Sequence, residues 1–479
     1  MMYNIHNIIN KYSLPIAHEK QSVLEFLRQY YNGFVKELEE VVNQNYPDDV
    51  PTFFNDSLSA KFLPTIKSEC EIILNILELD QKNLQAEKRE SFNELMDMLV
   101  ECGAFRKLYI EEEGLMSRIR QGSELYDRKD MFHISFSQRQ FSSSQRFSIP
   151  GNPCLYLSVF PGIKLRMGEM FELSWMESGM PKVFNACLYK AQKELVFLHF
   201  AKKGHAYLKE YKNAETEKKK RERLEAIAQY LLTFPIRAAC FISIKNKHIQ
   251  KNVRYYEEYS FPQLLMEWIQ KNEEFDGVAY QSASSLSEAK KVTAYNVALP
   301  IRDVDSVDGY DIKLKESFKL SFPEKIDLIE EVRVLENDVS AVERYAKGLE
   351  EKLMISNASM RHPYYWLLSI CHHLCFIFSE IKNRNVYSML IPFQELSTFC
   401  HVSLFVNKTI EHVQTAEEWI GLYKQYKGDT VLSEEDYEII LKQFQIVHLT
   451  FQKMRNVFHL NKFNNYAFTE PNFDFIYRK

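Results

Sequence analysis

Apolar residues recur at every third or fourth position along the first hundred or so residues of the chain. This spacing runs through 22–42 (SVLEFLRQYYNGFVKELEEVV), 66–79 (IKSECEIILNILEL) and 90–105 (ESFNELMDMLVECGAF). Side chains spaced in this way lie on one side of a helix, so the three segments are predicted to be amphipathic helices. The NYPDDVP stretch at 45–51 separates the first helix from the second. The pattern predicts a helical N-terminal domain over residues 1–113.

Short segments of alternating apolar and polar residues replace the helical spacing between residues 114 and 305. They are 154–160, 194–200, 238–245, 275–282 and 296–301. Their β-branched and aromatic residues predict strands. Two helices interrupt these strands, one over 214–232 and one that opens at Ser260, where Ser260 and Gln263 have the spacing of a capping box. The pattern predicts a mixed α+β domain over 114–305.

Helical spacing returns from Pro323 to the end and predicts a helical C-terminal domain over 320–479. The most apolar run of the chain, 364–381, lies in this domain. It contains His372, His373, Ser379 and Glu380, which are costly at the centre of a bilayer, so we expect a buried helix there. No internal repeat and no low-complexity linker occurs, so we expect the domains to pack together.

Composition and charge exclude several classes of protein. With 479 residues, of which 46% are hydrophobic, the chain is globular and long enough for about two to four domains. The formal net charge of −5 provides no basic field that would attract nucleic acid or an anionic membrane. The eight cysteines are mostly far apart, which is typical of a reducing cytosol, and the first residues lack the pattern of a signal peptide. We therefore expect a cytoplasmic protein without a membrane partner.

Two motifs suggest other chemistry but have simpler interpretations. KKKRER at 218–223 could contact nucleic acid, but acids flank it at the spacing of a solvated helix face. CHHLC at 371–375 could hold zinc, but its two histidines point away from the side of a helix that Cys371 and Cys375 share. The chain also lacks the phosphate-binding and dinucleotide-binding glycine motifs. We predict no metal and no bound cofactor, and nucleic acid is not an expected partner.

One stretch, QRFSIPGNPCLYLS at 145–158, combines a charge, a turn and a strand. Pro150, Gly151 and Pro153 fix a turn that brings Arg146 close to the strand carrying Tyr156. A guanidinium placed in this way can bind a phosphate or a carboxylate. The same residues also fit an ordinary hairpin entry with a surface arginine and a core tyrosine. The stretch by itself does not decide between these interpretations.

The stretch is part of an ordered series of motifs that resembles the RES domain family. The series is SRIR at 117–120, MFHISFSQR at 131–139, the stretch itself, an acid at Glu169 or Glu172, and then FPIRAACFISIK, FPQLLMEWIQ, FDGVAYQS and NVALP. The resemblance covers roughly residues 115–302, under half of the chain. It implies a central α+β domain with an ADP-ribosyltransferase-like fold between two helical domains. The N-terminal segment resembles the HEPN-like helical regions that are fused to RES domains.

The resemblance implies that NAD+ is the substrate and that its nicotinamide–ribose bond is cleaved. Cleavage develops positive charge on the ribose, which Glu169 would stabilise. Arg118 and Arg146 would hold the pyrophosphate by forked hydrogen bonds. Tyr156 would stack on or hydrogen-bond the nicotinamide, and Ser282 would fix the carboxamide or the ribose.

Further residues complete the predicted site. Arg120, Arg139 and Tyr280 are additional candidates for contacts with the substrate. The connection after Tyr156 is longer than in the family, and it offers Glu172 as an alternative to Glu169. The longer connection leaves the identity of the acid open, and also whether the site is active.

Three functions stay open on the sequence alone. The first is an NAD+ glycohydrolase or phosphorylase that acts as a toxin or as an anti-phage defence effector. The second is an ADP-ribosyltransferase that modifies a macromolecule, and the third is a catalytically inactive helical sensor or interaction protein. The resemblance also implies an antitoxin or trigger protein as a partner, and the flanking helices would restrain the site. The sequence leaves the oligomeric state open, a homo-oligomer included.

Overall fold

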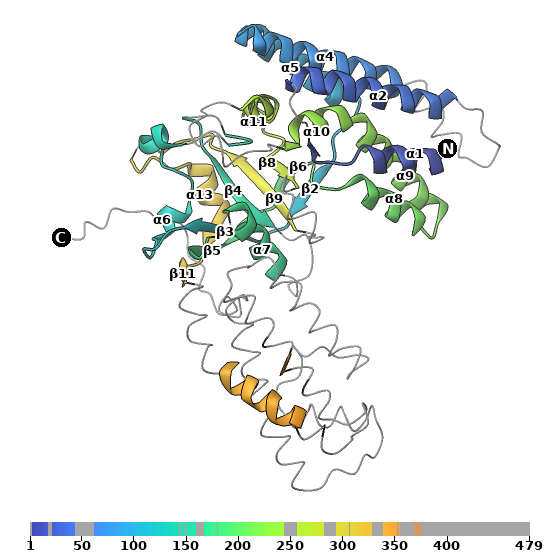
Figure 1. Cartoon of the computed structure of the whole chain (residues 1–479). Coiled ribbons are helices and arrows are strands. Elements are labelled where there is room, and N and C mark those ends of the chain that lie inside the picture. The colour runs from blue at the N-terminus through green and yellow to red at the C-terminus, as the bar shows by residue number, and fades with distance from the viewer. Residues whose placement is uncertain are drawn as a thin grey trace. The chain divides into compact units, whose positions relative to one another are not determined.

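The computed structural model divides the chain into two compact units, Met1–Lys325 with Tyr466–Lys479, and Ile326–Asn465 (Figure 1). The residues that it describes are 2–17, 22–43, 62–142, 145–148, 151–159, 167–179, 181–243, 256–281, 294–305, 307–327, 339–351, 354, 368, 371–372 and 375. In the second unit, 339–351 are helical, whereas most of the predicted C-terminal domain, including most of the apolar run 364–381, lies outside the described residues. The candidate site belongs to the first unit.

Among the described residues, the N-terminal part of the first unit contains helices α1 (Met2–Lys11), α2 (Val23–Asn43), α4 (Leu63–Gln81) and α5 (Gln85–Glu101). The last three confirm the helices predicted from the apolar spacing. Their apolar faces are buried, with Leu27, Ile73 and Leu95 fully inaccessible to solvent. These side chains share one apolar cluster with residues of the predicted mixed domain, such as Leu265 and Val278. The helical and the mixed segments therefore have a common core.

A nine-stranded sheet forms the centre of the unit, so the fold is mixed α+β (Figure 1). Its strands are β2 (Lys107–Ile110), β3 (Leu115–Gln121), β4 (Cys154–Val159), β5 (Val183–Ala191), β6 (Leu195–His199), β8 (Gly277–Tyr280), β9 (Tyr295–Pro300), β10 (Phe318–Leu320) and β11 (Glu324–Asp327). The order is β10-β5-β3-β4-β9-β8-β6-β2, and β11 also pairs with β5. Along this path β6 and β8 are parallel and the other pairs are antiparallel.

Four of the predicted strands are confirmed as β4, β6, β8 and β9, whereas the prediction for 238–245 was largely wrong. Helix α10 (Phe234–Cys240) covers the beginning of that segment, and only the short β7 (Ile242–Ser243) follows, paired with β1 (Ile16–Ala17). Every residue of α10 is buried. A short apolar run that is buried on all sides has no periodicity to distinguish a helix from a strand, and Pro235 fits the first turn of the helix.

The sheet divides its side chains between two apolar clusters, because successive residues of a strand point to opposite sides. On one side Tyr156, Val278 and Tyr280 meet α1, α2, α4, α5, α8 (Gly204–Lys212), α9 (Glu217–Leu232), α10 and α11 (Ser260–Lys271). We call this side the helix-covered face. The opposite face carries Leu155 and Tyr189, which pack near α6 (Arg128–Met131) and α13 (Ile312–Ser317).

Helix α7 (Met167–Glu177) also packs on the helix-covered face. The hydroxyl of Ser117 in β3 donates to the carbonyl oxygen of Met170 at 3.2 Å. It also lies 2.8 Å from the hydroxyl oxygen of Ser174. Ser117 is in register with Ser158, two residues from Tyr156 in β4. Therefore α7 and Tyr156 lie on the same side of the sheet.

Helix α11 begins at Ser260, as predicted, but the predicted capping box is absent. The residue at the cap position is Tyr259, and no side chain caps the helix. The hydroxyl of Ser260 bonds Asp80 and Lys88 instead. The side chain of Gln263 donates to two carbonyl oxygens of the turn 145–148. The two residues have partners in other elements, which compete with the local cap.

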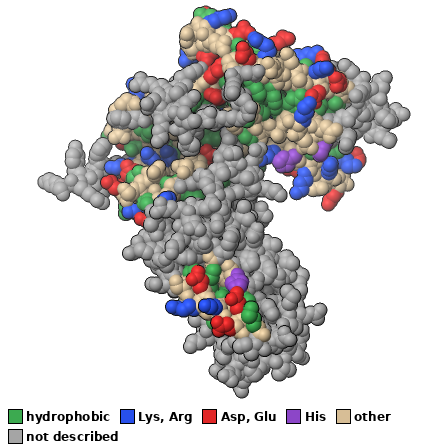
Figure 2. Space-filling view, viewed as in Figure 1, with side chains coloured by type: hydrophobic (Ala, Val, Ile, Leu, Met, Phe, Trp, Pro, Cys, Tyr) green, Lys and Arg blue, Asp and Glu red, His purple; other side chains and the backbone are tan. Residues whose placement is uncertain are grey.

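Basic and acidic side chains alternate on the exposed side of α9, as the sequence predicted for KKKRER at 218–223. Lys220 pairs with Glu217, and Arg223 pairs with Glu210. Figure 2 shows basic and acidic side chains mixed over the visible face. Within the described part of the chain no helix is long and apolar enough to cross a bilayer, and no group of acidic, histidine or cysteine side chains could hold a metal ion.

Candidate functional site

Three of the predicted site residues, Arg146, Tyr156 and Tyr280, lie together on the helix-covered face, although they come from separate segments. Burial raises the pKa of Tyr280 well above its ordinary value, the charge of Glu177 raises it further, and the charge of Arg146 opposes this shift. The Arg146 guanidinium lies 5.3 Å from the ring centre of Tyr259. We call Arg146, Tyr156, Tyr259 and Tyr280 the Arg146 group.

Arg146 is fixed by a tight turn and by the end of a helix. The turn is closed by two backbone hydrogen bonds between Gln145 and Ser148, of 2.9 and 3.2 Å. The Nη1 and Nη2 atoms of Arg146 donate to the carbonyl oxygens of Cys240 at 2.8 Å and Ile242 at 3.0 Å. Carbonyl groups at the end of a helix such as α10 lack partners within the helix. With two of its five N–H groups, Arg146 satisfies the carbonyl of Cys240 at the end of α10 and bonds that of Ile242 in β7.

Tyr156 connects this turn to the sheet. Its hydroxyl accepts a hydrogen bond from the backbone N–H of Phe147 at 3.0 Å and lies 3.0 Å from the Ser148 hydroxyl oxygen. Burial raises the pKa of Tyr156 well above its ordinary value, so the hydroxyl is neutral at physiological pH. Both Arg146 and Tyr156 therefore have partners within the fold, which is the simpler interpretation that the sequence left open.

The structure places Arg118 and Arg120 on the opposite face of the sheet. Arg118 is directly across from Cys187 in β5, close to Tyr189. Burial lowers the pKa of Arg118, and its Nη1 atom is buried without a hydrogen-bond partner in the described part of the chain. Arg120 donates to the backbone carbonyl of Asp130. In β3 it is Ser117 that shares the side of Tyr156, so Arg118 and Arg146 do not meet in one cleft.

A third arginine, Arg128 in α6, lies near Arg118, and sequence reasoning missed it. Its guanidinium stacks on Phe322, 3.8 Å from the ring centre. Its Nε and Nη2 atoms are buried and find no hydrogen-bond partner among the residues that the structure describes. The positive charges of Arg128 and Arg118 both act on the buried thiol of Cys187, whose pKa burial raises to about 12. No signal in the segment YDRKDM would have singled out Arg128.

The remaining predicted residues are separate from the Arg146 group or outside the described part of the chain. Arg139 is exposed in the 3-10 helix η2 (Phe136–Phe141) and stacks on Phe136, 4.1 Å from the ring centre. Ser282 lies outside the described residues, as do the side chains of Glu169 and Glu172, whose backbone belongs to α7. Sequence reasoning missed Tyr259, a member of the group, and Glu177, a neighbour of it. Glu177 could have been found, since it follows Glu169 by about two helical turns.

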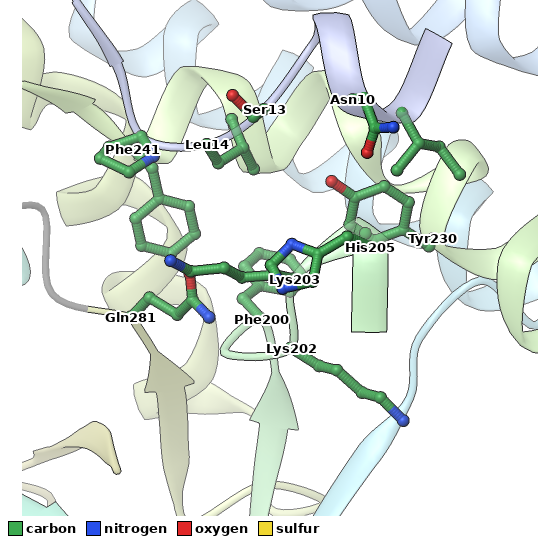
Figure 3. A pocket seen from close by; sticks show the side chains of 13 residues that line it. Asn10, Ser13, Leu14, Phe200, Lys202, Lys203, His205, Tyr230, Phe241 and Gln281 are labelled. Atoms are coloured by element: carbon green, nitrogen blue, oxygen red, sulfur yellow. The ribbon is translucent and has the colours of Figure 1, made fainter. Parts of the chain in front are cut away.

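A pocket of about 240 Å³ opens beside the Arg146 group (Figure 3). The ring of Phe241 forms part of its wall and stacks on Tyr280, with 6.3 Å between ring centres and 16° between planes. The lining residues are Ile9, Asn10, Ser13, Leu14, Pro15, Phe200, Lys202, Lys203, Gly204, His205, Tyr230, Phe241 and Gln281. None of the residues predicted as part of the site lines this pocket.

Comparison with known proteins identifies a distant relative. The chain is 25% identical over 331 residues to a protein of Bacillus subtilis (strain 168) named "Putative toxin YopC". The match covers 66% of this chain and 69% of the relative. No protein-family model and no solved structure matches the chain.

Proposed function

We propose that the chain is a toxin that cleaves the nicotinamide–ribose bond of NAD+. The ordered motifs that resemble RES domains support the reaction, and the name of the Bacillus subtilis relative supports the role as a toxin. The observation that carries the proposal is the convergence of Arg146, Tyr156 and Tyr280 on the face that α7 covers, since α7 contains both candidate acids. By the same resemblance, an antitoxin would keep the activity silent.

The proposed chemistry needs a carboxylate, a cation and aromatic rings. As the bond breaks, its electron pair leaves with the nicotinamide nitrogen, and the ribose acquires positive charge. A carboxylate of α7, from Glu169 or Glu172, would stabilise that charge before water or phosphate attacks the ribose carbon. Arg146 would bind the pyrophosphate through the N–H groups that the two backbone carbonyls leave free. The ring of Tyr280 or Tyr259 would stack on the nicotinamide.

This assignment differs from the sequence-based hypothesis in its use of arginines. Arg118 and Arg120 lie on the opposite face of the sheet, so a single arginine, Arg146, binds the substrate in the proposal. The three tyrosines of the group would act as hydrogen-bond donors and stacking surfaces. Burial raises the pKa of Tyr156 and Tyr280, which keeps these two from acting as bases.

The proposal is tested by incubating the purified full-length protein with NAD+ and measuring the nicotinamide released. We expect Glu169→Gln or Glu172→Gln to reduce the rate about 100-fold to 1,000-fold, the loss typical of a group that stabilises developing charge. Glu225→Gln, at an exposed position of α9, is the matched control and should keep the wild-type rate. Absence of nicotinamide release from the wild type, or equal rates in both acid variants and the control, would contradict the proposal.

A second candidate function is that of a catalytically inactive sensor or interaction protein. The observation that favours it is that Arg146 and Tyr156 already have partners within the fold. The measurement of nicotinamide release separates this candidate from an enzyme. If nicotinamide is released only when a protein acceptor is present, and the acceptor gains mass, the chain is an ADP-ribosyltransferase.

A further inference from the structure

The pocket beside Tyr280 lies where the N-terminal segment meets the central sheet. Residues 9–15 form one wall, and the connection from β6 to α8, with Gln281 at the end of β8, forms the other (Figure 3). The backbone N–H of Ile16 bonds the carbonyl oxygen of Phe241 at 3.0 Å, and β1 pairs with β7 directly after it. The backbone thus holds the N-terminal wall against Phe241, which also lines the pocket.

A glycine allows the two walls to approach. A Cβ atom at Gly204 would lie 2.4 Å from Cγ2 of Ile9 and 2.9 Å from the ring of Tyr230, far closer than atoms tolerate. Any other residue at the first position of α8 would therefore push α1 or Tyr230 away and change the shape of the pocket. The pocket depends on close packing of three elements, α1, α8 and α9.

The charged side chains that line the pocket are all basic: no carboxylate occurs among the lining residues that the structure describes. Lys203, His205 and Gln281 extend across the pocket below Asn10 and Ser13 (Figure 3). Burial lowers the pKa of His205, and the positive charges of Lys203 and Lys209 lower it further. Lys202 points away from the pocket and pairs with Glu210. The ammonium group of Lys203, with the imidazole of His205 as a hydrogen-bond donor beside it, makes the pocket a favourable environment for an anion.

Aromatic rings form much of the apolar lining. Phe200, Tyr230 and Phe241 present surfaces on which a planar heterocycle can stack, and the amides of Asn10 and Gln281 can bond its polar edge. The volume of about 240 Å³ is below the roughly 300–1,000 Å³ of sites for drug-sized ligands. The volume therefore limits the occupant to a ligand smaller than a dinucleotide.

We propose that this pocket binds a mononucleotide, with its phosphate on Lys203 and His205 and its base against the aromatic rings. This site is separate from the Arg146 group, and the inference does not depend on cleavage of NAD+. Phe241 lines the pocket and also stacks on Tyr280, so an occupant would contact a side chain that touches the Arg146 group. The proposed nucleotide site therefore lies next to the candidate site.

Calorimetric titration of the full-length protein with AMP, with adenosine and with inorganic phosphate tests the proposal. AMP should bind saturably and more tightly than either of its parts, and its affinity should fall as salt rises. Lys203→Met should weaken AMP about tenfold or more, as expected for loss of a charge-assisted hydrogen bond. Lys212→Met, in the last turn of α8, is the matched control, since Lys212 is exposed and does not line the pocket, and it should bind AMP nearly as the wild type does.

A second readout keeps the test independent of folding defects in the variants. In the wild type, bound AMP should raise the pKa of His205, followed by NMR, because a phosphate stabilises the protonated imidazole. The absence of saturable AMP binding, an unchanged affinity in Lys203→Met, or equal binding of adenosine and AMP would overturn the proposal. NAD+ is absent from these titrations, so their failure is distinct from a failure of the proposed reaction.

Discussion

At the scale of single residues, two buried histidines show how the fold holds neutral groups in its core. Nε2 of His133 accepts a hydrogen bond from the backbone N–H of Asp311 at 3.0 Å, which a protonated ring could not do. Burial lowers the pKa of His133 to about 4. Burial, with the nearby charges of Arg237, Lys202 and Arg106, lowers that of His199 to about 3. The folded state therefore opposes protonation of both rings.

The stability of the first unit should fall as the pH falls from about 6.5 toward 4. In this range an unfolded histidine binds a proton and the folded one does not, so the unfolded state gains protons. Each histidine should lower the free energy of unfolding by about 1.4 kcal/mol per pH unit in this range. Urea denaturation between pH 7 and pH 5 measures the slope. His133→Gln keeps an acceptor and removes the titration, so it should flatten the dependence; an unchanged slope would contradict the assignment.

At the scale of elements, helix α10 lies between the N-terminal helices and the central sheet and bonds both. Glu69 of α4 is fully buried and accepts a hydrogen bond from the backbone N–H of Ile236, in the first turn of α10, at 3.0 Å. Arg237 of α10 is also buried and donates to the carbonyl oxygens of His199 and Phe200, at the end of β6. Polar side chains thus connect an N-terminal helix, α10 and the sheet.

Glu69 should behave as a neutral acid, because burial raises its pKa well above the ordinary value. Glu69→Gln, which keeps the acceptor and the shape, is therefore expected to change the free energy of unfolding by less than about 0.5 kcal/mol. Glu69→Ala leaves a buried N–H group without a partner and should cost about 1–3 kcal/mol. Chemical denaturation of both variants checks this difference. Equal losses in the two variants would show that a charge at Glu69 matters.

At the scale of the whole molecule, the N-terminal helices and the sheet stabilise each other. Side chains of α2, α4 and α5 belong to the same apolar cluster as those of α9, α10 and α11. Removal of the N-terminal helices would expose apolar residues of α10 and α11, such as Phe261 and Leu265, which are now buried. An exposed apolar surface of this kind favours aggregation.

A chain that lacks residues 1–105 should therefore lose its cooperative thermal unfolding and become insoluble. Co-expression of residues 1–105 as a separate chain should restore part of the soluble protein, since the lost contacts are noncovalent. The yield of soluble protein and the thermal transition, each compared with the full-length chain, are the measurements. A soluble shortened chain with a transition like that of the full-length protein would show that the sheet is stable by itself.

Local patterns predicted several elements in which apolar residues recur at a regular period. Helix α2 and strand β4 follow from their spacing, since the period of the apolar residues reports the backbone conformation. The prediction of a strand over 238–245 was wrong because α10 is buried on all sides. The prediction of a capping box at Ser260 was wrong because the Ser260 hydroxyl bonds Asp80 and Lys88 in place of a backbone N–H group of its own helix. Long-range contacts explain both errors.

The sequence by itself determined the mixed α+β class, five helices (α2, α4, α5, α9 and α11), four strands (β4, β6, β8 and β9) and the solvated face of KKKRER, because these depend on neighbours along the chain. Only the tertiary structure decided that Arg146, Tyr156 and Tyr280 meet while Arg118 lies across the sheet. Alternation places residues relative to each other within one strand, but it does not say which residue of β3 pairs with which residue of β4. That register follows from packing of the whole sheet, and the pocket depends on the same packing.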